Sequence, residues 1–123
     1  MKGRERTFFE HLWNDCAADK ARSISEADRV AYTQADSRPG RMAAGFAYFS
    51  TFPKTAVDFA ELAKTKFPFP VLSIGGDKAN GVALGAQVKL IAPDVTVIVL
   101  KNTGHWILEE RRDETIAALN QFL

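Results

Sequence analysis

Hydrophobic residues recur at helical spacing through the first half of the chain. The first apolar face is formed by Phe8, Phe9, Leu12, Trp13 and Cys16. Steps of three and four residues are typical of one side of a helix. We therefore predict a helix there that ends before Ser23, with Cys16 as a small core residue.

Three further helices are predicted before residue 68. Ser23 and Glu26 have the spacing of a capping box, with Ser25 as a competing cap. The helix that they open would place Ala27, Val30 and Ala31 on one face. Pro39-Gly40 interrupts the chain, the next helix spans residues 42–52, and Pro53 stops it. The last helix spans residues 54–67, with Val57, Leu62 and Phe59 facing inward.

The pattern changes near Pro68, where short β-branched apolar runs alternate with glycine. Residues 71–74 are apolar and end at Gly75-Gly76, and residues 95–100 form a second such run, so both are predicted as buried strands. Leu84, Val88 and Ile91 indicate a helix between them, which makes the two strands parallel. The inner side of a closing helix is predicted from Ile116, Leu119, Phe122 and Leu123.

The predicted fold class is therefore α/β, with a helical layer at residues 1–67 and a β-α-β-α unit at residues 68–123. Two parallel strands buried on both faces leave unpaired hydrogen-bonding edges and do not make a stable sheet alone. Another copy of the chain, a partner segment or the first-half helices must cover these edges. The sequence leaves these three possibilities open.

Composition and charge exclude several classes of function. The 123 residues are 46% hydrophobic and 25% charged, and 16 Lys and Arg nearly balance 15 Asp and Glu. This balance gives no reason to expect nucleic acid or a membrane as partner. One cysteine and two histidines argue against a metal site, and no cofactor is expected. The charged N-terminus and the lack of a long apolar run predict a cytoplasmic protein.

His105 is the strongest candidate for chemistry. It follows the second predicted strand after a glycine, in the loop at the carboxyl end of a parallel strand, where α/β sheets bind their ligands. An imidazole there can accept a proton from a nucleophile or from water. A hydrogen-bonded loop histidine without a catalytic role explains its position equally well.

Two segments extend this interpretation. The first reads FPVLSIGGDK at residues 69–78, and the second reads GHWILEE at residues 104–110, before the closing helix. Together with residues 37–50, they resemble the α/β-hydrolase family, and in particular its epoxide hydrolase and haloalkane or haloacetate dehalogenase branch. The resemblance covers nearly the whole chain and identifies the helical layer as a lid, or cap, over a partial α/β-hydrolase fold.

The resemblance implies that His105 activates water against an ester intermediate on an aspartate, or on a serine in esterase relatives. Such a nucleophile lies on a glycine-flanked elbow before the lid, and no Gly-X-Ser-X-Gly or Gly-X-Asp-X-Gly occurs in the chain. The acid of the triad would fall at Ala79 in many relatives. Asp77 is the nearest carboxylate and is our candidate, with a structural turn residue as the alternative.

The resemblance also suggests residues that contact substrate. Lid tyrosines of epoxide hydrolases donate a proton to the opening ring, and the similar position here is Phe49, with Tyr48 one place earlier. A shift of one residue rotates a helical side chain by about 100°. Trp106 lines a pocket or fixes the histidine loop. Core packing is the simpler interpretation of the aromatic stripe to which Phe49 belongs.

These observations predict a truncated α/β-hydrolase related to enzymes that hydrolyse epoxides, haloacids or esters, inactive alone, with a small molecule as substrate. A complementing chain, or further copies of this one, would complete the sheet. The alternative is a non-catalytic binding or assembly module that oligomerises through its exposed sheet edge. A gene fragment without selected function is a third possibility.

Overall fold

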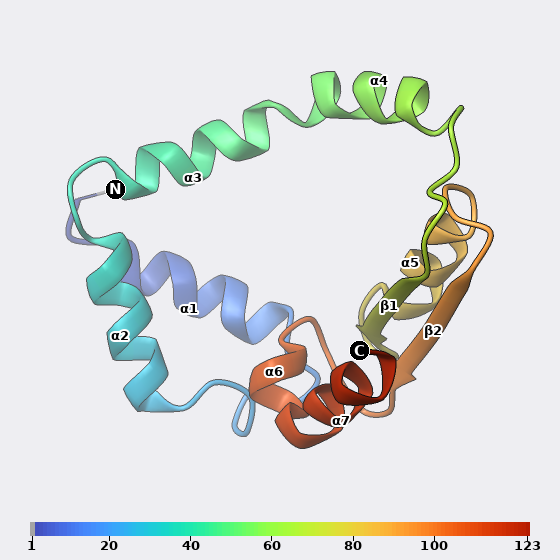
Figure 1. Ribbon diagram of the computed structural model, residues 1–123. Helices are drawn as coiled ribbons and strands as arrows, with labels where there is room; N and C mark the ends of the chain where they lie inside the picture. The colour runs from blue at the N-terminus through green and yellow to red at the C-terminus, as the bar shows by residue number, and fades with distance from the viewer. Residues whose placement is uncertain (1) are drawn as a thin grey trace.

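The computed structural model describes residues 2–123, and within this range it has seven helices and two strands (Figure 1). The first half is helical, as predicted, and the second half contains the strands. The elements are, in order, α1 (Glu5–Asp15), α2 (Glu26–Asp36), α3 (Arg41–Ser50), α4 (Phe52–Leu62), β1 (Val71–Gly76), α5 (Gly81–Val88), β2 (Val95–Leu100), α6 (Ile107–Glu110) and α7 (Arg112–Phe122).

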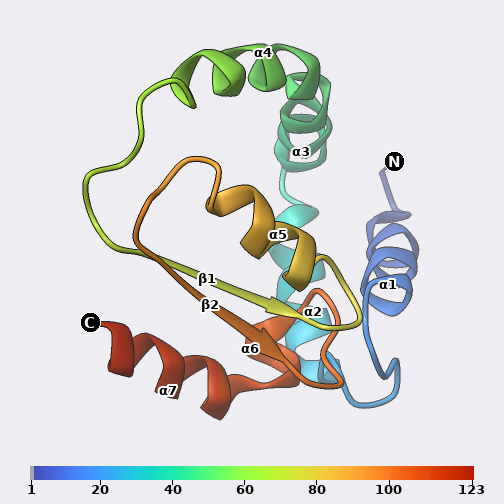
Figure 2. The ribbon, with the colours of Figure 1, turned by 90° about the vertical axis from the view of Figure 1, so that its right-hand side faces the viewer.

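The two strands form a parallel pair, which confirms the predicted topology. Val71 lies opposite Val95, and the register continues to Gly76 opposite Leu100. α5 connects the strands and packs on both, while α7 lies on the other side of them (Figure 2). The predicted α/β class is therefore correct. The helices α1–α4 make no extensive contact with either strand, so the described chain leaves the outer strand edges uncovered.

Trp13 is the centre of the helical layer, which we define as residues 2–67, with helices α1–α4 and the segments between them. Its side chain is 4% exposed and stacks with Phe9 at 5.5 Å between ring centroids. The buried guanidinium of Arg29 lies 5.5 Å from the indole ring and donates hydrogen bonds to the Ile24 carbonyl and to Asn14 Oδ1. α1 and α2 thus pack around one indole. A cation on an aromatic face, with its N–H groups paired, is a stable buried arrangement.

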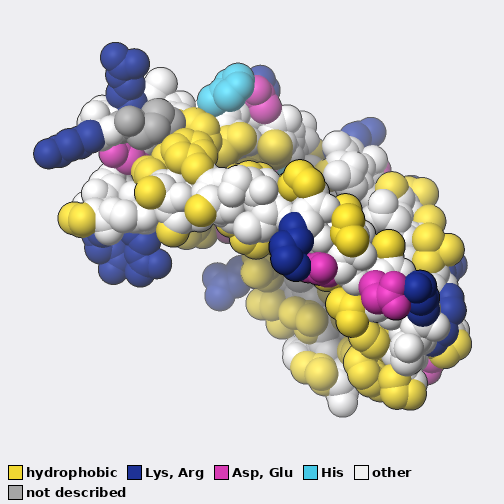
Figure 3. Space-filling view, turned by 90° about the horizontal axis from the view of Figure 1, so that it is seen from above, with side chains coloured by type: hydrophobic (Ala, Val, Ile, Leu, Met, Phe, Trp, Pro, Cys, Tyr) yellow, Lys and Arg dark blue, Asp and Glu magenta, His cyan; other side chains and the backbone are white. Residues whose placement is uncertain are grey.

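α3 and α4 extend away from this centre as an arch (Figure 1). The arch carries aromatic and aliphatic side chains that the described chain does not cover, and the view from above shows hydrophobic side chains at its surface (Figure 3). Val57, Phe59 and Leu62 are 64–70% exposed, so their predicted inward orientation is wrong. The periodicity was real, but an amphipathic face is buried only where another element packs against it.

Two other core predictions are wrong for local reasons. Cys16 is exposed, because it lies just beyond the end of α1 rather than on its apolar face. On α7, Thr115 and Ala118 are buried, whereas Ile116, Leu119 and Leu123 are exposed. The small residues of α7 therefore face the rest of the molecule. Thr115 is satisfied because its hydroxyl donates to the carbonyls of Ile107 and Arg111.

Helix boundaries differ from the prediction at two points. Ser25 rather than Ser23 caps α2, since its hydroxyl oxygen accepts a hydrogen bond from the Asp28 amide. Pro53 does not stop α3 but lies in the first turn of α4, where its missing N–H costs nothing. Asp28 thus takes the place that was predicted for Glu26 in the capping box.

Crossing a membrane and binding a metal ion each place a requirement on the described residues. None of the helices described is long and apolar enough to cross a membrane. Over residues 2–123, no group of three or more His, Cys, Asp or Glu side chains is arranged to hold a metal ion.

Glycines permit the closest backbone contacts of the fold. A Cβ atom at Gly76 would collide with the carbonyl oxygens of Thr103 and Gly104, so the end of β1 needs a residue without a side chain. A Cβ at Gly104 would collide with the backbone of residues 16–18. The loop after β2 therefore touches the sheet on one side and the helical layer on the other.

We expect Gly76→Ala to lower the free energy of unfolding by about 1–3 kcal/mol or more, because the obstructing atoms are backbone. Gly45→Ala is the matched control, since Gly45 lies within α3 and has no neighbouring atom in the way. The control should be neutral or stabilise the protein by about 0.5–1 kcal/mol. Urea denaturation monitored by circular dichroism measures both. Equal stability of the two variants would contradict the close contact at Gly76.

Candidate active site

His105 lies in the loop between β2 and α6, as predicted from its position after the second strand. Its backbone N–H donates to the Cys16 carbonyl at 2.8 Å. Its exposed imidazole meets the Trp106 ring edge-on, with 5.0 Å between the ring centroids. The histidine is therefore held through its backbone, and within residues 2–123 its imidazole forms no hydrogen bond.

The His105 side chain borders a cavity of about 440 Å³. The cavity lies beside the carboxyl end of β1 and the first turns of α5, with an apolar contribution from Leu84 and Ile107 and a polar one from Asn80 and Gln87. A volume of this size is within the range of small-molecule sites. No carboxylate, thiol or serine hydroxyl lines it among the residues described.

Glu110 fastens the segment that carries His105. Its Oε2 accepts hydrogen bonds from the Gly104 amide at 2.9 Å and the Ala18 amide at 3.1 Å, and its Oε1 accepts from the Trp106 amide at 3.3 Å. Sequence reasoning did not single out Glu110 as a site residue. The only signal was a pair of carboxylates shortly after the Gly-His-Trp sequence.

Trp106 fixes the loop rather than lining the cavity. Its Nε1 donates to the Trp13 carbonyl at 3.0 Å, and its side chain is partly buried. Trp106 is not among the residues around the His105 cavity. This placement agrees with the fastening role, and contact of Trp106 with a substrate stays a prediction.

Asp77 binds the backbone of the loop and not the histidine. Its Oδ1 accepts a hydrogen bond from the Thr103 amide at 3.1 Å. This bond lowers the pKa of the Asp77 carboxyl below its ordinary value, with smaller contributions in the same direction from the Asn102 amide, Lys78 and Lys101. Within the described chain, no hydrogen bond joins Asp77 to His105. Its geometry is that of a carboxylate tying together the ends of β1 and β2.

Tyr48 and Phe49 lie on α3, away from the His105 cavity. Their side chains are 67% and 59% exposed, and both rings contact Phe52. Neither residue borders the cavity next to His105. The structure therefore does not bring the two predicted lid residues together with the histidine.

A second link between the helical layer and α6 was also not predicted. The Tyr32 hydroxyl donates to Glu109 Oε1 at 2.9 Å. The hydrogen bond to this carboxylate is the main reason that the pKa of Tyr32 is raised, and partial burial adds to it. Glu109 and Glu110 therefore each bind the helical layer, one through a side chain and the other through a backbone amide.

No protein-family model and no curated protein sequence matches the chain. Several solved structures, among them the following three, are similar to it in fold. Cfl2 from Burkholderia cenocepacia is 26% identical with a TM-score of 0.87, over 98% of this chain and 41% of that protein. The epoxide hydrolase CorEH is 22% identical with a TM-score of 0.86, over 95% and 41%. A variant of aCif is 23% identical with a TM-score of 0.81, over 94% and 37%.

The chain thus spans about two fifths of the length of these proteins. They have the α/β-hydrolase fold, and the match extends over the helical layer and the strands together. The predicted resemblance is confirmed at this level, and the present structure is part of an α/β-hydrolase fold.

The lowered pKa of Asp77 predicts a pH dependence of stability. A carboxyl with a depressed pKa in the folded state stabilises the protein above its unfolded pKa of about 3.9, and this stabilisation is lost as the pH falls through the folded pKa. The urea midpoint should therefore fall less steeply on acidification below about pH 5 in Asp77→Asn than in the unmodified protein. Asp58→Asn, which removes an exposed partner of Lys54, is the control. Equal slopes in all three proteins would refute the prediction.

Proposed function

We propose that His105 is the general base of a hydrolase that acts on a small electrophile, an epoxide, a haloacid or an ester. The observation that supports this most is its placement, on a backbone-fastened loop at the carboxyl end of a parallel strand beside a cavity of about 440 Å³. Ligands of open α/β sheets bind at this end of the strands. The fold shared with CorEH, which is described as an epoxide hydrolase, supports the substrate class.

The proposed chemistry needs one proton acceptor and one nucleophile. The nucleophile displaces halide or alcohol, or opens the epoxide ring, and so forms an ester with the substrate. His105 then takes a proton from water while the water oxygen attacks the ester carbonyl. The ester C–O bond breaks, and His105 returns its proton to the leaving oxygen. An epoxide or haloacid substrate leaves with a new hydroxyl group, an ester substrate leaves as its carboxylic acid, and the nucleophile is restored in each case.

The nucleophile and the donors that stabilise the negative charge on the ester oxygen would come from outside these 123 residues. The chain has no glycine-flanked serine or aspartate elbow, and no carboxylate or hydroxyl lines the His105 cavity in the described structure. We therefore propose that the 123 residues alone do not turn over substrate, and that a complementing polypeptide completes both the sheet and the site.

The remaining predicted residues take more limited roles in this proposal. Asp77 holds the tip of β1 against the loop after β2 rather than serving as the triad acid, as its hydrogen bond to Thr103 indicates. Tyr48 and Phe49 would reach substrate only through a rearrangement of the arch. A nearly balanced charge supports a small-molecule ligand in place of nucleic acid. We also propose a cytoplasmic location.

Replacement of His105 tests the proposal. The chain is expressed together with its native flanking coding sequence, and hydrolysis of styrene oxide, haloacetate and p-nitrophenyl acetate is measured. We expect His105→Gln to lower turnover by about 100-fold or more, the usual contribution of a positioned general base. An ester on the nucleophile should accumulate and be visible by mass spectrometry.

His11→Gln is the matched control, because His11 is the other histidine and lies exposed beside Asp15 on α1. It should leave turnover unchanged. Turnover that is equal in His105→Gln and the unmodified protein would remove His105 from the mechanism. Turnover by the isolated 123 residues would show that the nucleophile lies within them.

A second candidate function is non-catalytic assembly. The observation that favours it is the pair of strands with uncovered outer edges, together with an apolar arch that includes Phe49, Phe52 and Val57. Unpaired edges and large apolar patches promote association. Light scattering over a range of concentrations distinguishes the two candidates, since a monomer at high concentration would contradict assembly through copies of this chain.

A further inference from the structure

We propose that Glu110 is the positioning residue of His105, and that it also couples the histidine to the helical layer. This inference rests on the proposed function, because positioning matters only if the imidazole of His105 reacts. The hydrogen bonds of Glu110 are present in the structure whether or not the chain is active.

The backbone amides of three consecutive residues, Gly104, His105 and Trp106, donate hydrogen bonds to acceptors that lie outside β2. The Gly104 and Trp106 amides both donate to the Glu110 carboxylate, and the His105 amide between them donates to the Cys16 carbonyl. The peptide groups on both sides of His105 are therefore held. With the backbone fixed, the direction in which the imidazole leaves it is restricted to the side-chain rotamers.

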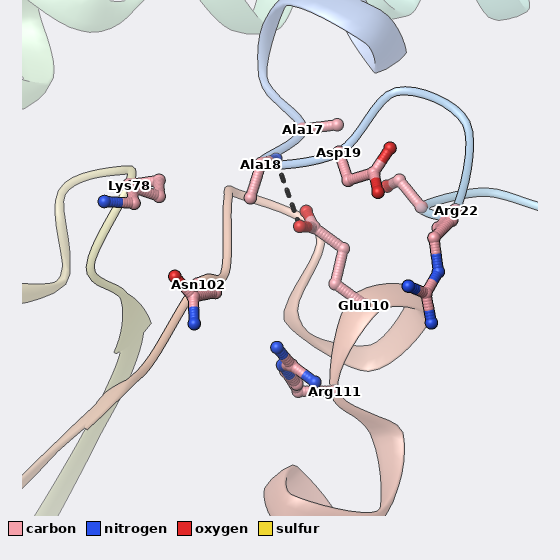
Figure 4. Close-up of a pocket in the computed structure, with 9 residues that line it drawn as sticks. Ala17, Ala18, Asp19, Arg22, Lys78, Asn102, Glu110 and Arg111 are labelled. Atoms are coloured by element: carbon pink, nitrogen blue, oxygen red, sulfur yellow. Dashed lines mark hydrogen bonds between the residues drawn. The ribbon is translucent and has the colours of Figure 1, made fainter.

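The carboxylate also reaches across to the helical layer. Figure 4 shows the Glu110 side chain extending from α6 to the backbone of Ala18, in the segment after α1, where its Oε2 accepts the amide hydrogen bond. One oxygen thus joins residues 18 and 104, which are far apart in the sequence. Movement of the segment after α1 would be transmitted to the backbone beside His105 through this atom.

A purely local role does not account for this geometry. Glu110 and Trp106 are bonded in both directions, since the Glu110 amide donates to the Trp106 carbonyl and the Trp106 amide donates to Glu110 Oε1. The first of these bonds is the ordinary i to i−4 bond of a helix, and the second satisfies the free amide of the N-cap residue Trp106, so both would stabilise α6 by themselves. The bonds from Gly104 and Ala18 add nothing to α6. Their presence indicates that the carboxylate serves the loop and the layer as well.

The charge of the carboxylate strengthens these bonds. Hydrogen bonds from neutral N–H groups to an ionised acceptor are roughly twice as strong as those between neutral partners. Glutamine has the same size but only one acceptor atom, and its amino group would face an N–H donor. Glu110→Gln therefore loses at least one of the three bonds. A cavity of about 460 Å³ borders Glu110, so a glutamine at this position has room to change its rotamer.

Glu110→Gln is compared with Glu109→Gln by native-state hydrogen exchange. Glu109 is the neighbouring carboxylate of the same short helix and accepts from the Tyr32 hydroxyl, so it controls for loss of charge in α6. We expect exchange at the Gly104 and Trp106 amides to accelerate by about tenfold or more in Glu110→Gln. Glu109→Gln should change these rates less than about twofold, and amides within β2 should be unaffected in both.

The NMR chemical shifts of the His105 imidazole distinguish a positioning role of Glu110 from a purely structural one, because a purely structural role would leave them unchanged. The ring of His105 lies edge-on to Trp106, so its carbon-bound protons carry a ring-current shift in the NMR spectrum. We expect this shift to move towards the value of an unstructured histidine in Glu110→Gln and to remain in Glu109→Gln. Unchanged His105 shifts in a folded Glu110→Gln would overturn the proposal.

Glu110→Asp provides the second variant if Glu110→Gln does not fold. Aspartate keeps the charge but is one methylene shorter, so it cannot reach all three amides, and the same shift and exchange changes are expected. Failure of both variants to fold, with Glu109→Gln folded, would overturn the proposal in favour of a purely structural residue. Neither hydrogen exchange nor the NMR shifts require turnover. A negative result for Glu110 is therefore distinguishable from a negative result in the His105→Gln assay, which tests the proposed function.

Discussion

The contact between the loop after β2 and the segment after α1 is the constraint on which the rest of the structure depends. It is a contact of backbone with backbone, in which the His105 amide donates to the Cys16 carbonyl and Gly104 leaves room for residues 16–18. Side chains could not bring the two layers this close, because a Cβ at position 104 would already collide. The same contact fixes the backbone of the candidate catalytic residue, so the position of His105 depends on the segment after α1.

The sheet is the less complete half of the molecule. Two parallel strands with one connecting helix bury few side chains fully, and the described core is small around them. The arch of α3 and α4 likewise exposes aromatic residues, which in a folded protein are usually part of the hydrophobic core. Both features agree with a chain that spans about two fifths of the proteins it resembles. In the proposed function, a complementing polypeptide completes the sheet.

The sequence predicted the elements whose signals are local. β2 was placed at its observed bounds because Val95 to Leu100 is an unbroken apolar run between Pro-Asp and Asn-Thr-Gly. The position of His105 followed from that strand. The orientation of side chains was predicted less well. Val57 and Phe59 were predicted to face inward, but burial of their face needs another element packed against α4, and the described chain does not provide one. Glu110 could not be predicted, because its amide partners at Ala18 and Gly104 become neighbours only in the folded chain.

The two tryptophans of the chain report on the junction between the layers. Trp13 is the buried centre of the helical layer, and Trp106 donates its indole N–H to the Trp13 carbonyl from the other layer. Since the chain has no other tryptophan, its tryptophan fluorescence comes from these two residues. Separation of the layers would break the hydrogen bond of the Trp106 indole and expose this ring to water, while Trp13 would stay packed between α1 and α2. A shift of the Trp106 emission to longer wavelength would therefore report the separation.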